Sequence, residues 1–142
     1  MVLKFPEWLR IVKNFGVEYT APSISCFFLR RKANGSCVFL LKTPRDSYCS
    51  LQDLKPQACK MWPFKILDKP KYGKAKHAAY DSWKQRLYIY LDQACTGIRY
   101  GIPTKDFSHS VLPEFVELAL GVRRKQHRST SMLHPPILGG NL

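Results

Sequence analysis

Residues 23–42 decide the fold that we predict for this chain, and they read SISCFFLRRKANGSCVFLLK. Two runs rich in Phe, Val, Ile and Leu, residues 23–30 and 36–42, flank the dipeptide Asn34-Gly35. Asn-Gly between two such runs is the strongest short-range signal for a β-hairpin, because both turn positions need a positive φ. The stretch therefore predicts a hairpin over about 23–42.

The predicted hairpin is apolar on both faces near its base and basic near its tip. A two-residue turn pairs Phe28 with Leu41 near the base and Arg30 with Phe39 nearer the tip. A strand pair that is apolar on both faces must be covered on both faces. In so small a chain, a neighbouring subunit is one source of the second cover.

Three further stretches predict helices. Residues 6–15 combine a proline and a glutamate in the first turn with a glycine just beyond the end. Residues 76–99 carry apolar side chains at three- and four-residue steps and form the longest predicted helix. Residues 110–126 also place a proline and a glutamate near their start, and they end in basic residues, which suit the negative end of a helix dipole.

The predicted fold class is α+β, with an N-terminal helix, the hairpin, two C-terminal helices and extended basic segments. We expect a single domain over 1–126 and an extended tail over 127–142. The tail has no periodicity on which to fold, so we expect it to dock on partners. Residues 43–74 hold four prolines and little periodicity, which predicts an extended connection that follows a surface, apart from a short helix over 51–54 with Ser50 as its cap.

Lysine and arginine outnumber the acidic residues by 23 to 10 in 142 residues, a formal net charge of +13, while 45% of the residues are hydrophobic. The apolar content argues against a disordered chain. The charge indicates acidic partners, of which phosphate backbones are the commonest. Because self-repulsion at this charge opposes compactness, we expect an acidic partner in the native setting.

The cysteines indicate a reducing compartment. An odd number leaves one thiol over in an all-disulfide scheme, and no two have the C-x2-C spacing of a zinc site. Cys49 and Cys59 have the C-x9-C spacing of small helical-hairpin proteins of the mitochondrial intermembrane space, but a second such pair is missing. We expect buried free thiols, and whether Cys49 and Cys59 are paired stays open. The five cysteines are Cys26, Cys37, Cys49, Cys59 and Cys95.

The N-terminal residues 1–15 form a short basic amphipathic segment. No stretch of the chain is apolar over the roughly 20 residues that span a bilayer, and this end lacks the apolar core and cleavage site of a secretory signal. Two interpretations of the segment stay open. It is either an uncleaved mitochondrial address or an ordinary first helix that covers the core.

The titratable residues give little support to catalysis or to metal binding. Ser108, His109 and Ser110 adjoin one another, and Cys95 is a candidate partner for a histidine, but neither comes with a local catalytic signature. The carboxylates are scattered, the four histidines share no ligand spacing, and the single glycine pair precedes no helix. We therefore predict no enzyme activity, no metal, no cofactor and no small-molecule substrate.

Three basic clusters are the candidate contact sites: the hairpin tip, a stretch around Tyr72, and the end of the last predicted helix. We expect them to converge on one surface that contacts RNA or an acidic partner, with Tyr72, Tyr80 or Tyr100 available to stack. The competing interpretation is a generally basic, solvated surface. No RNP-type strand and no GXXG loop indicates sequence-specific RNA recognition. The predicted contact residues are Arg30, Arg31, Lys32, Lys69, Lys71, Lys74, Lys76, Arg123, Arg124, Lys125 and Arg128.

These features predict a non-catalytic structural or accessory subunit of a large mitochondrial assembly, in the matrix or on the matrix side of the inner membrane. A ribosome-type particle with rRNA and protein contacts comes first, because RNA most simply neutralises the charge. The alternative is a peripheral accessory subunit of a respiratory-chain complex or ATP synthase, with residues 4–15 on anionic lipid headgroups. That alternative draws on the dispersed charges and on residues 133–142, which include no Lys, Arg, Asp or Glu.

Overall fold

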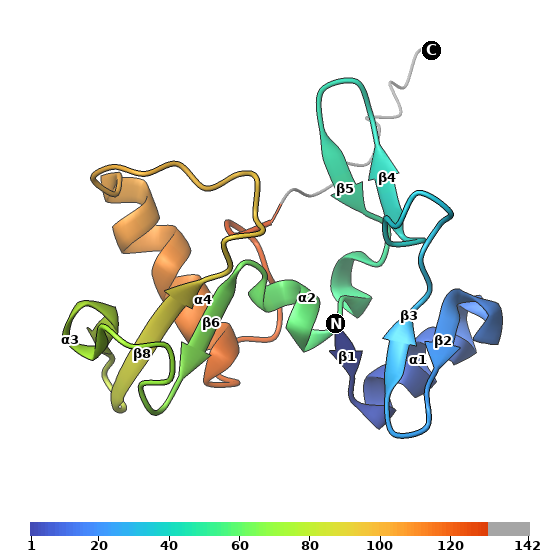
Figure 1. The fold of residues 1–142 in the computed structure, drawn as a ribbon, viewed down its shortest axis with the longest axis horizontal. Coiled ribbons are helices and arrows are strands. Elements are labelled where there is room, and N and C mark those ends of the chain that lie inside the picture. The colour runs from blue at the N-terminus through green and yellow to red at the C-terminus, as the bar shows by residue number, and fades with distance from the viewer. Residues whose placement is uncertain (131–142) are drawn as a thin grey trace, which may run out of the picture. The chain divides into compact units, whose positions relative to one another are not determined.

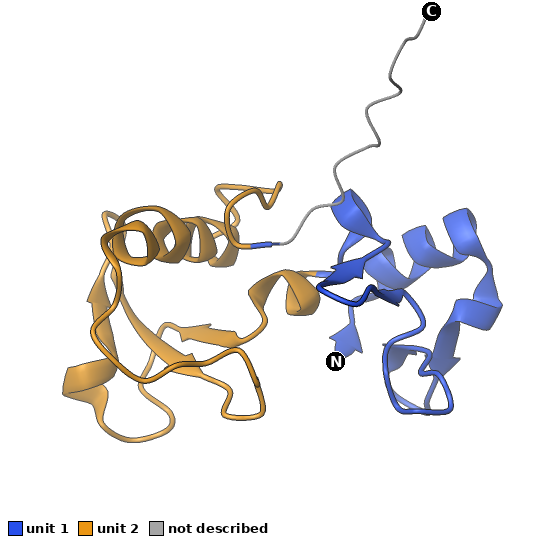
Figure 2. Cartoon of the chain, turned by 90° about the horizontal axis from the view of Figure 1, so that it is seen from above, with its two compact units in different colours: residues 1–56, 130–142 blue, residues 57–129 orange. Residues whose placement is uncertain are grey.

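The computed structural model describes residues 1–130 and contains short helices mixed with small antiparallel sheets, an α+β fold (Figure 1). The predicted fold class is therefore confirmed at this level. The chain divides into two compact units (Figure 2): unit 1 comprises residues 1–56 together with 130–142, and unit 2 comprises residues 57–129. Each unit has its own sheets and its own buried side chains.

Unit 1 begins with strand β1 (Val2–Leu3) and the predicted N-terminal helix, α1 (Phe5–Phe15). The Glu7 carboxylate accepts a hydrogen bond from the Lys4 backbone N–H (2.9 Å), which closes the first turn. Gly16 ends the helix with a φ of 110°, a conformation that glycine adopts at low cost. The apolar side of α1 packs into a cluster that contains Leu3, Ile11, Phe39 and Leu51.

A three-stranded antiparallel sheet packs on α1 in the order β1-β3-β2. Strands β2 (Thr20–Pro22) and β3 (Phe27–Leu29) form a hairpin, and β1 pairs with the other edge of β3. The Trp8 ring stacks on Phe27 with centroids 4.6 Å apart, and its Nε1 donates to the hydroxyl of buried Thr20 (3.2 Å). A short 3-10 helix, η1 (Val17–Tyr19), connects α1 to this sheet.

The predicted hairpin over 23–42 is wrong in its strand pairing, although its turn is present. Both edges of β3 are taken by β1 and β2, so no edge is left for the second apolar run. Strand β4 (Leu40–Lys42) pairs instead with β5 (Ser47–Cys49). Between the two runs, the part of the chain that the structure describes retains only an isolated bridge from Arg31 to Cys37.

The Asn34-Gly35 turn closes the loop between β3 and β4. Gly35 has a φ of 79°, and its N–H donates to the Lys32 carbonyl (2.9 Å). The Asn34 side-chain oxygen accepts from the Ser36 N–H (3.1 Å), which is the local turn that asparagine favours. The residue types at the turn therefore act as predicted, even though the flanking runs do not pair.

We expect Gly35→Ala to lower the free energy of unfolding by about 1 kcal/mol, because a Cβ disfavours the left-handed backbone. No atom lies within 4 Å of where that Cβ would stand, so the loss reports on backbone conformation and not on a clash. Gly35→Asn should lose less, since asparagine adopts this conformation more readily. Urea unfolding of both variants is the measurement, and equal losses would contradict the explanation.

Unit 2 contains a three-stranded antiparallel sheet where the sequence predicted a helix over 76–99, and that prediction is wrong. Only α3 (Ala75–Ala78) is helical, and it leads into strand β7 (Ala79–Asp81) and strand β8 (Arg86–Leu91). The strand order is β6-β8-β7, so β8 pairs with β6 (Phe64–Leu67) on one side and with β7 on the other.

Local chemistry explains why strands replace the predicted helix. The Ser82 hydroxyl accepts a hydrogen bond from the Gln85 N–H (3.1 Å) and donates to its carbonyl, which closes a turn in the middle of the expected helix. The sequence of β8, RLYIYL, alternates and is rich in aromatic and β-branched residues, which fit a pleated sheet. Most of the apolar residues at three- and four-residue steps belong to two short strands and to the turn between them, so their spacing does not mark one face of a helix.

The second layer of unit 2 is formed by a π-helix, η3 (Phe107–Val111), that continues into α4 (Leu112–Ala119). The predicted helix over 110–126 is therefore correct in place but too long, because Gly121 follows with a φ of 71°. Figure 1 shows α4 behind the strands. Phe115, Val116 and Leu118 are buried, and the Phe64 and Phe115 rings lie 4.5 Å apart.

Residues 43–74 are more regular than the predicted extended connection. They contain β5, the 3-10 helix η2 (Gln52–Leu54), helix α2 (Gln57–Met61) and β6. The predicted short helix over 51–54 is present as η2. The other three elements were missed because each has only three to five residues, too few for a periodicity to emerge. Helix α2 packs against α4 within unit 2.

Two other predictions concern the cysteines and membrane-spanning segments. Cys26, Cys37, Cys49 and Cys95 are free thiols, but every cysteine of the chain is half-buried where we expected full burial. Among residues 1–130, no helix has the length and apolar content needed to cross a membrane. The predicted domain over 1–126 and the docked tail over 127–142 stay predictions, and most of the tail lies outside the described residues.

Candidate nucleic-acid interface

The face of the unit 2 sheet that points away from α4, here called the outer face, carries tyrosines beside cations. Phe64 packs on α4 and lies opposite Leu91, so the next pair in the register, Lys65 and Tyr90, lies on the outer face. The alternation along β8 places Arg86 and Tyr88 on the same face.

Residues 68–76, here called the Tyr72 loop, fold back onto Tyr90. The Tyr90 hydroxyl donates to the Gly73 carbonyl (3.2 Å) and accepts from the Lys71 N–H (3.3 Å). The Tyr72 and Tyr90 rings meet edge to face with centroids 5.1 Å apart. Positive φ values at Gly73 (74°) and Lys74 (47°) then turn the chain into α3. These contacts hold Tyr72 at the rim of the outer face.

Two amino groups flank the Tyr72 ring. Lys65 Nζ lies 5.2 Å and Lys71 Nζ 5.7 Å from the ring centroid, within the range of a cation–π contact. The Tyr72 side chain nevertheless stays 53% exposed. An accessible ring with cations around it is suited to a ligand that has both a flat apolar surface and negative charge.

Carboxylates already neutralise two of the cations on the outer face. Lys65 Nζ lies 3.2 Å from Asp92 Oδ2, and Arg86 Nε lies 2.6 Å from Asp81 Oδ1. The hydrogen bond from Arg86 holds the pKa of Asp81 below its ordinary value, and the Ala94 N–H, followed by Lys65, lowers the pKa of Asp92. Both carboxylates therefore stay ionised at neutral pH, and both pairs persist.

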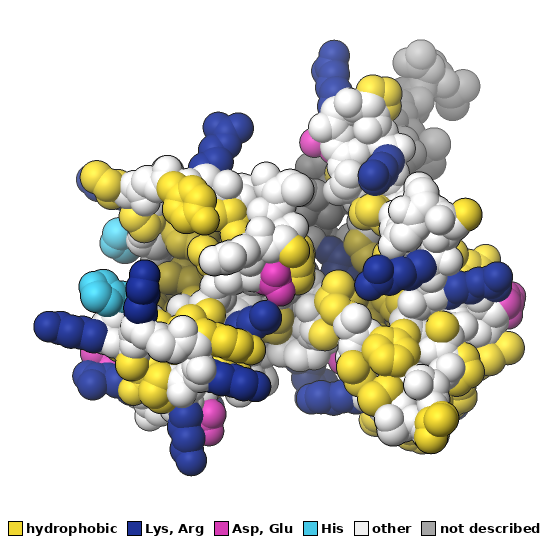
Figure 3. All heavy atoms as spheres, in the orientation of Figure 1, with side chains coloured by type: hydrophobic (Ala, Val, Ile, Leu, Met, Phe, Trp, Pro, Cys, Tyr) yellow, Lys and Arg dark blue, Asp and Glu magenta, His cyan; other side chains and the backbone are white. Residues whose placement is uncertain are grey.

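The four predicted contact lysines of the Tyr72 loop are exposed and form no ion pair within residues 1–130. Unit 2 as a whole has 14 Lys and Arg against 6 Asp and Glu, a net charge of +8. Figure 3 shows Lys and Arg side chains projecting among hydrophobic ones on this unit. The loop lysines, whose charges remain available to an anion, are Lys69, Lys71, Lys74 and Lys76.

The predicted hairpin-tip cluster belongs to unit 1, whereas the other two clusters belong to unit 2. The expected convergence of all three on one surface therefore stays a prediction. Arg30 donates to the Glu18 carbonyl (3.2 Å) and Lys32 to the Leu40 carbonyl (2.8 Å). Their charged groups thus brace the loop between β3 and β4, and Arg31 is exposed beside them.

The third predicted cluster follows α4, and half of it is engaged within unit 2. Arg123 Nε lies 2.6 Å from Glu117 Oε2, and Arg128 Nη1 donates to the Ser110 hydroxyl oxygen (2.9 Å). The remaining two residues, Arg124 and Lys125, are exposed and form no ion pair in the described part of the chain.

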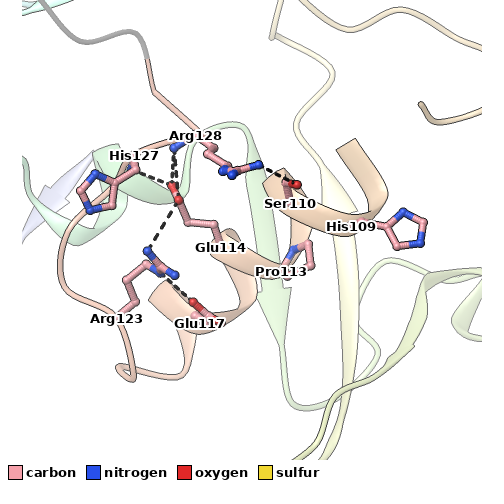
Figure 4. Close-up of a pocket in the computed structure, with 8 residues that line it drawn as sticks. All are labelled: His109, Ser110, Pro113, Glu114, Glu117, Arg123, His127 and Arg128. Carbon is pink, nitrogen blue, oxygen red and sulfur yellow. Dashed lines mark hydrogen bonds and ion pairs between the residues drawn. The ribbon is translucent and has the colours of Figure 1, made fainter. Parts of the chain in front are cut away.

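A cavity of about 430 Å³ lies beside this third cluster (Figure 4). The Glu114 carboxylate, whose side chain is only 4% exposed, accepts the backbone N–H groups of His127 (2.8 Å), Arg128 (3.1 Å) and Ser129 (3.1 Å). Burial alone would raise the pKa of Glu114, but these bonds and that of the Ser129 hydroxyl (2.7 Å) lower it to about 2. The lining residues are His109, Ser110, Pro113, Glu114, Glu117, Arg123, His127 and Arg128.

The charged groups of this cavity mainly bind one another. Arg123 pairs with Glu117, and its Nη1 lies 3.9 Å from Glu114, whereas Arg128 Nη1 lies 3.8 Å from Asp106. His109 Nδ1 donates a hydrogen bond to the Lys105 carbonyl (2.8 Å), and Figure 4 shows its ring on the opposite side of the labelled residues from His127. No three His, Cys, Asp or Glu side chains among residues 1–130 are placed to hold a metal ion. We interpret these contacts as structural, because they hold residues 127–129 against α4.

Sequence reasoning missed Tyr90, which supports the Tyr72 loop, because it assigned β8 to a helix. The signal was the alternation in RLYIYL, which as a strand puts Tyr88 and Tyr90 on one face. Tyr80, proposed for stacking, instead lies opposite buried Leu87 on the inner face, and Tyr100 is exposed. Comparisons with known protein families, with curated proteins and with solved structures give no match for this chain.

Proposed function

We propose that the chain is a non-catalytic RNA-binding subunit of a larger assembly, with a mitochondrial ribosome-type particle as the first choice. We propose further that the Tyr72 loop and the outer face of unit 2 form its RNA contact. The observation that carries the proposal is the set of four exposed lysines, without ion-pair partners among the described residues, around a ring held at the surface.

The physical argument rests on how charge and aromatic surface work together in nucleic-acid binding. Lysines on a phosphate backbone release condensed counterions, which provides most of the affinity without regard to sequence. An exposed ring adds stacking, which every base tolerates. Two hydrogen bonds between Tyr90 and the backbone on either side of Tyr72 hold the loop in place, so that the Tyr72 ring is presented at a fixed position on the surface, which suits a binding contact.

The alternative of an accessory subunit on a lipid surface has less support. Helix α1 was its membrane element, but the helix buries Ile11 and packs Trp8 and Phe15 against the core of unit 1. Among the described residues near this end, the apolar side chains left to a lipid surface are Met1, Val2 and Phe5. An interfacial helix normally offers a whole apolar face.

The test of the proposal is the salt dependence of RNA binding by the full chain. With four phosphate contacts on a single strand, the slope of log affinity against log salt should be about −3, so that affinity falls about 50-fold between 50 and 200 mM salt. Fluorescence polarisation with a labelled 20-nucleotide RNA measures this, and polyglutamate serves as a polyanion without bases. A flat response, or equal binding to polyglutamate, would remove the basis of the proposal.

A further inference from the structure

A second exposed ring lies in the turn between β7 and β8, on the same unit 2 sheet as the Tyr72 loop. Strand β6 ends at Leu67, which pairs with Tyr88, and the turn between β7 and β8 lies just beyond Arg86. The loop that follows β6 and this turn leave the sheet at one end, and the loop then returns along the outer face, so that Tyr72 lies beside Tyr90. The turn carries Trp83, whose side chain is 71% exposed.

The two rings share the same local chemistry. Lys84 Nζ lies 4.8 Å from the Trp83 ring, as Lys65 and Lys71 lie near Tyr72. The hydrogen bonds between Ser82 and Gln85 fix the turn that presents Trp83. Because an exposed indole presents a large apolar surface, a partner that covers it gains stability.

Ammonium groups beside both rings favour a nucleic acid over hydrocarbon as the partner. Inserting Trp83 into a bilayer would bring the adjacent Lys84 charge toward the hydrocarbon, which is costly. A nucleotide instead offers a base to the ring and a phosphate to the amine. In a duplex the bases are stacked and paired, so their faces are not accessible, whereas a single strand exposes them.

We infer that unit 2 binds single-stranded RNA in preference to duplex, with bases of one strand stacked on Tyr72 and on Trp83 at different places along β8. This inference rests on the proposed RNA-binding function and adds the class of substrate and a residue, Trp83, that composition did not indicate. Binding is expected to tolerate different base sequences, because stacking uses the π-face that all bases share.

The test compares a labelled 12-nucleotide RNA with the same RNA annealed to its complement, at 0.1 M salt, with the full chain. Wild type should bind the single strand more tightly. Trp83→Ala should weaken single-strand binding roughly 5- to 150-fold, the effect of losing one stacked base, and leave duplex binding unchanged. Trp83→Phe should restore most of the affinity, since a ring is retained.

Ile24→Ala is the control. Ile24 is a fully exposed apolar side chain of unit 1, outside the proposed contact residues, so single-strand binding should be unchanged. Equal affinity for single strand and duplex, with no effect of Trp83→Ala, would overturn this inference and leave a steep salt dependence intact. Absence of any RNA binding, or binding to anionic vesicles alone, would overturn the proposed function as well.

Discussion

Replacing Lys69, Lys71, Lys74 and Lys76 with glutamine should weaken RNA binding by about two to three orders of magnitude at 0.1 M salt. Each lysine on a single strand contributes roughly 0.7 to the slope of log affinity against log salt, so four lysines account for about 3 units of slope. The same variant should therefore also lose most of its salt dependence. Polarisation titrations at several salt concentrations measure both quantities.

A matched control separates a local site from the effect of net charge. Arg10, Lys13, Lys42 and Arg45 are exposed cations of unit 1 outside the predicted contact set, and their replacement by glutamine changes the formal charge by the same amount. This control should lose less than about 10-fold in affinity, because distant charges act only through the screened field. Equal losses in the two variants would mean that RNA is attracted by overall charge and not by the Tyr72 loop.

Glu114→Gln is expected to lower the free energy of unfolding by about 3 kcal/mol at pH 7. The amide loses the charge that three backbone N–H groups and the Ser129 hydroxyl stabilise, and hydrogen bonds to a charged group contribute about 1.5–3 kcal/mol each before desolvation is counted. Glu117→Gln is the control. Glu117 is about one-third exposed and pairs only with Arg123 among the described residues, so its loss should stay below about 1 kcal/mol.

The pH dependence of stability provides an independent readout of the same carboxylate. The pKa of Glu114 is lowered from 4.5 to about 2 in the folded state, so its contribution is complete above pH 4.5 and is lost as the pH falls through 2. At about 1.36 kcal/mol per pH unit, that contribution is about 3 kcal/mol. Wild type and Glu114→Gln should therefore converge toward pH 2 in urea unfolding series. A constant difference between pH 7 and pH 2 would show that packing, and not charge, explains the loss.

The candidate interface was predictable in its charge but not in its aromatic part. The lysines of the Tyr72 loop and Tyr72 itself stand together in the sequence, so their cluster needed no tertiary information. Tyr90 lies far along the chain and reaches the loop only because β8 pairs with β6. Trp83 falls within residues 76–99, which were predicted to be a helix, and only the turn between β7 and β8 reveals that it is exposed.

For the third basic cluster, too, the sequence predicted the charges but not the contacts that they form. The sequence predicted Arg123 in the last turns of a helix, where cations are favoured, but α4 ends at Ala119, so both Arg123 and Arg128 lie beyond it. Their engagement with Glu117 and Ser110, however, follows from how the chain turns after Gly121. Glu114 was expected to favour a helix start, and its bonds to residues 127–129 depend on the same turn.

The sequence by itself determined the net charge, helix α1 and the turn at Asn34 and Gly35, because each depends on neighbouring residues and on intrinsic backbone preferences. Tertiary structure alone decided which strands pair. The backbone N–H and C=O groups along a strand can hydrogen-bond to any strand in suitable register. Which strand pairs there depends on how side chains far apart in the sequence become buried together. For the same reason β3 pairs with β1 and β2 instead of β4, and residues 79–91 form a hairpin instead of a helix.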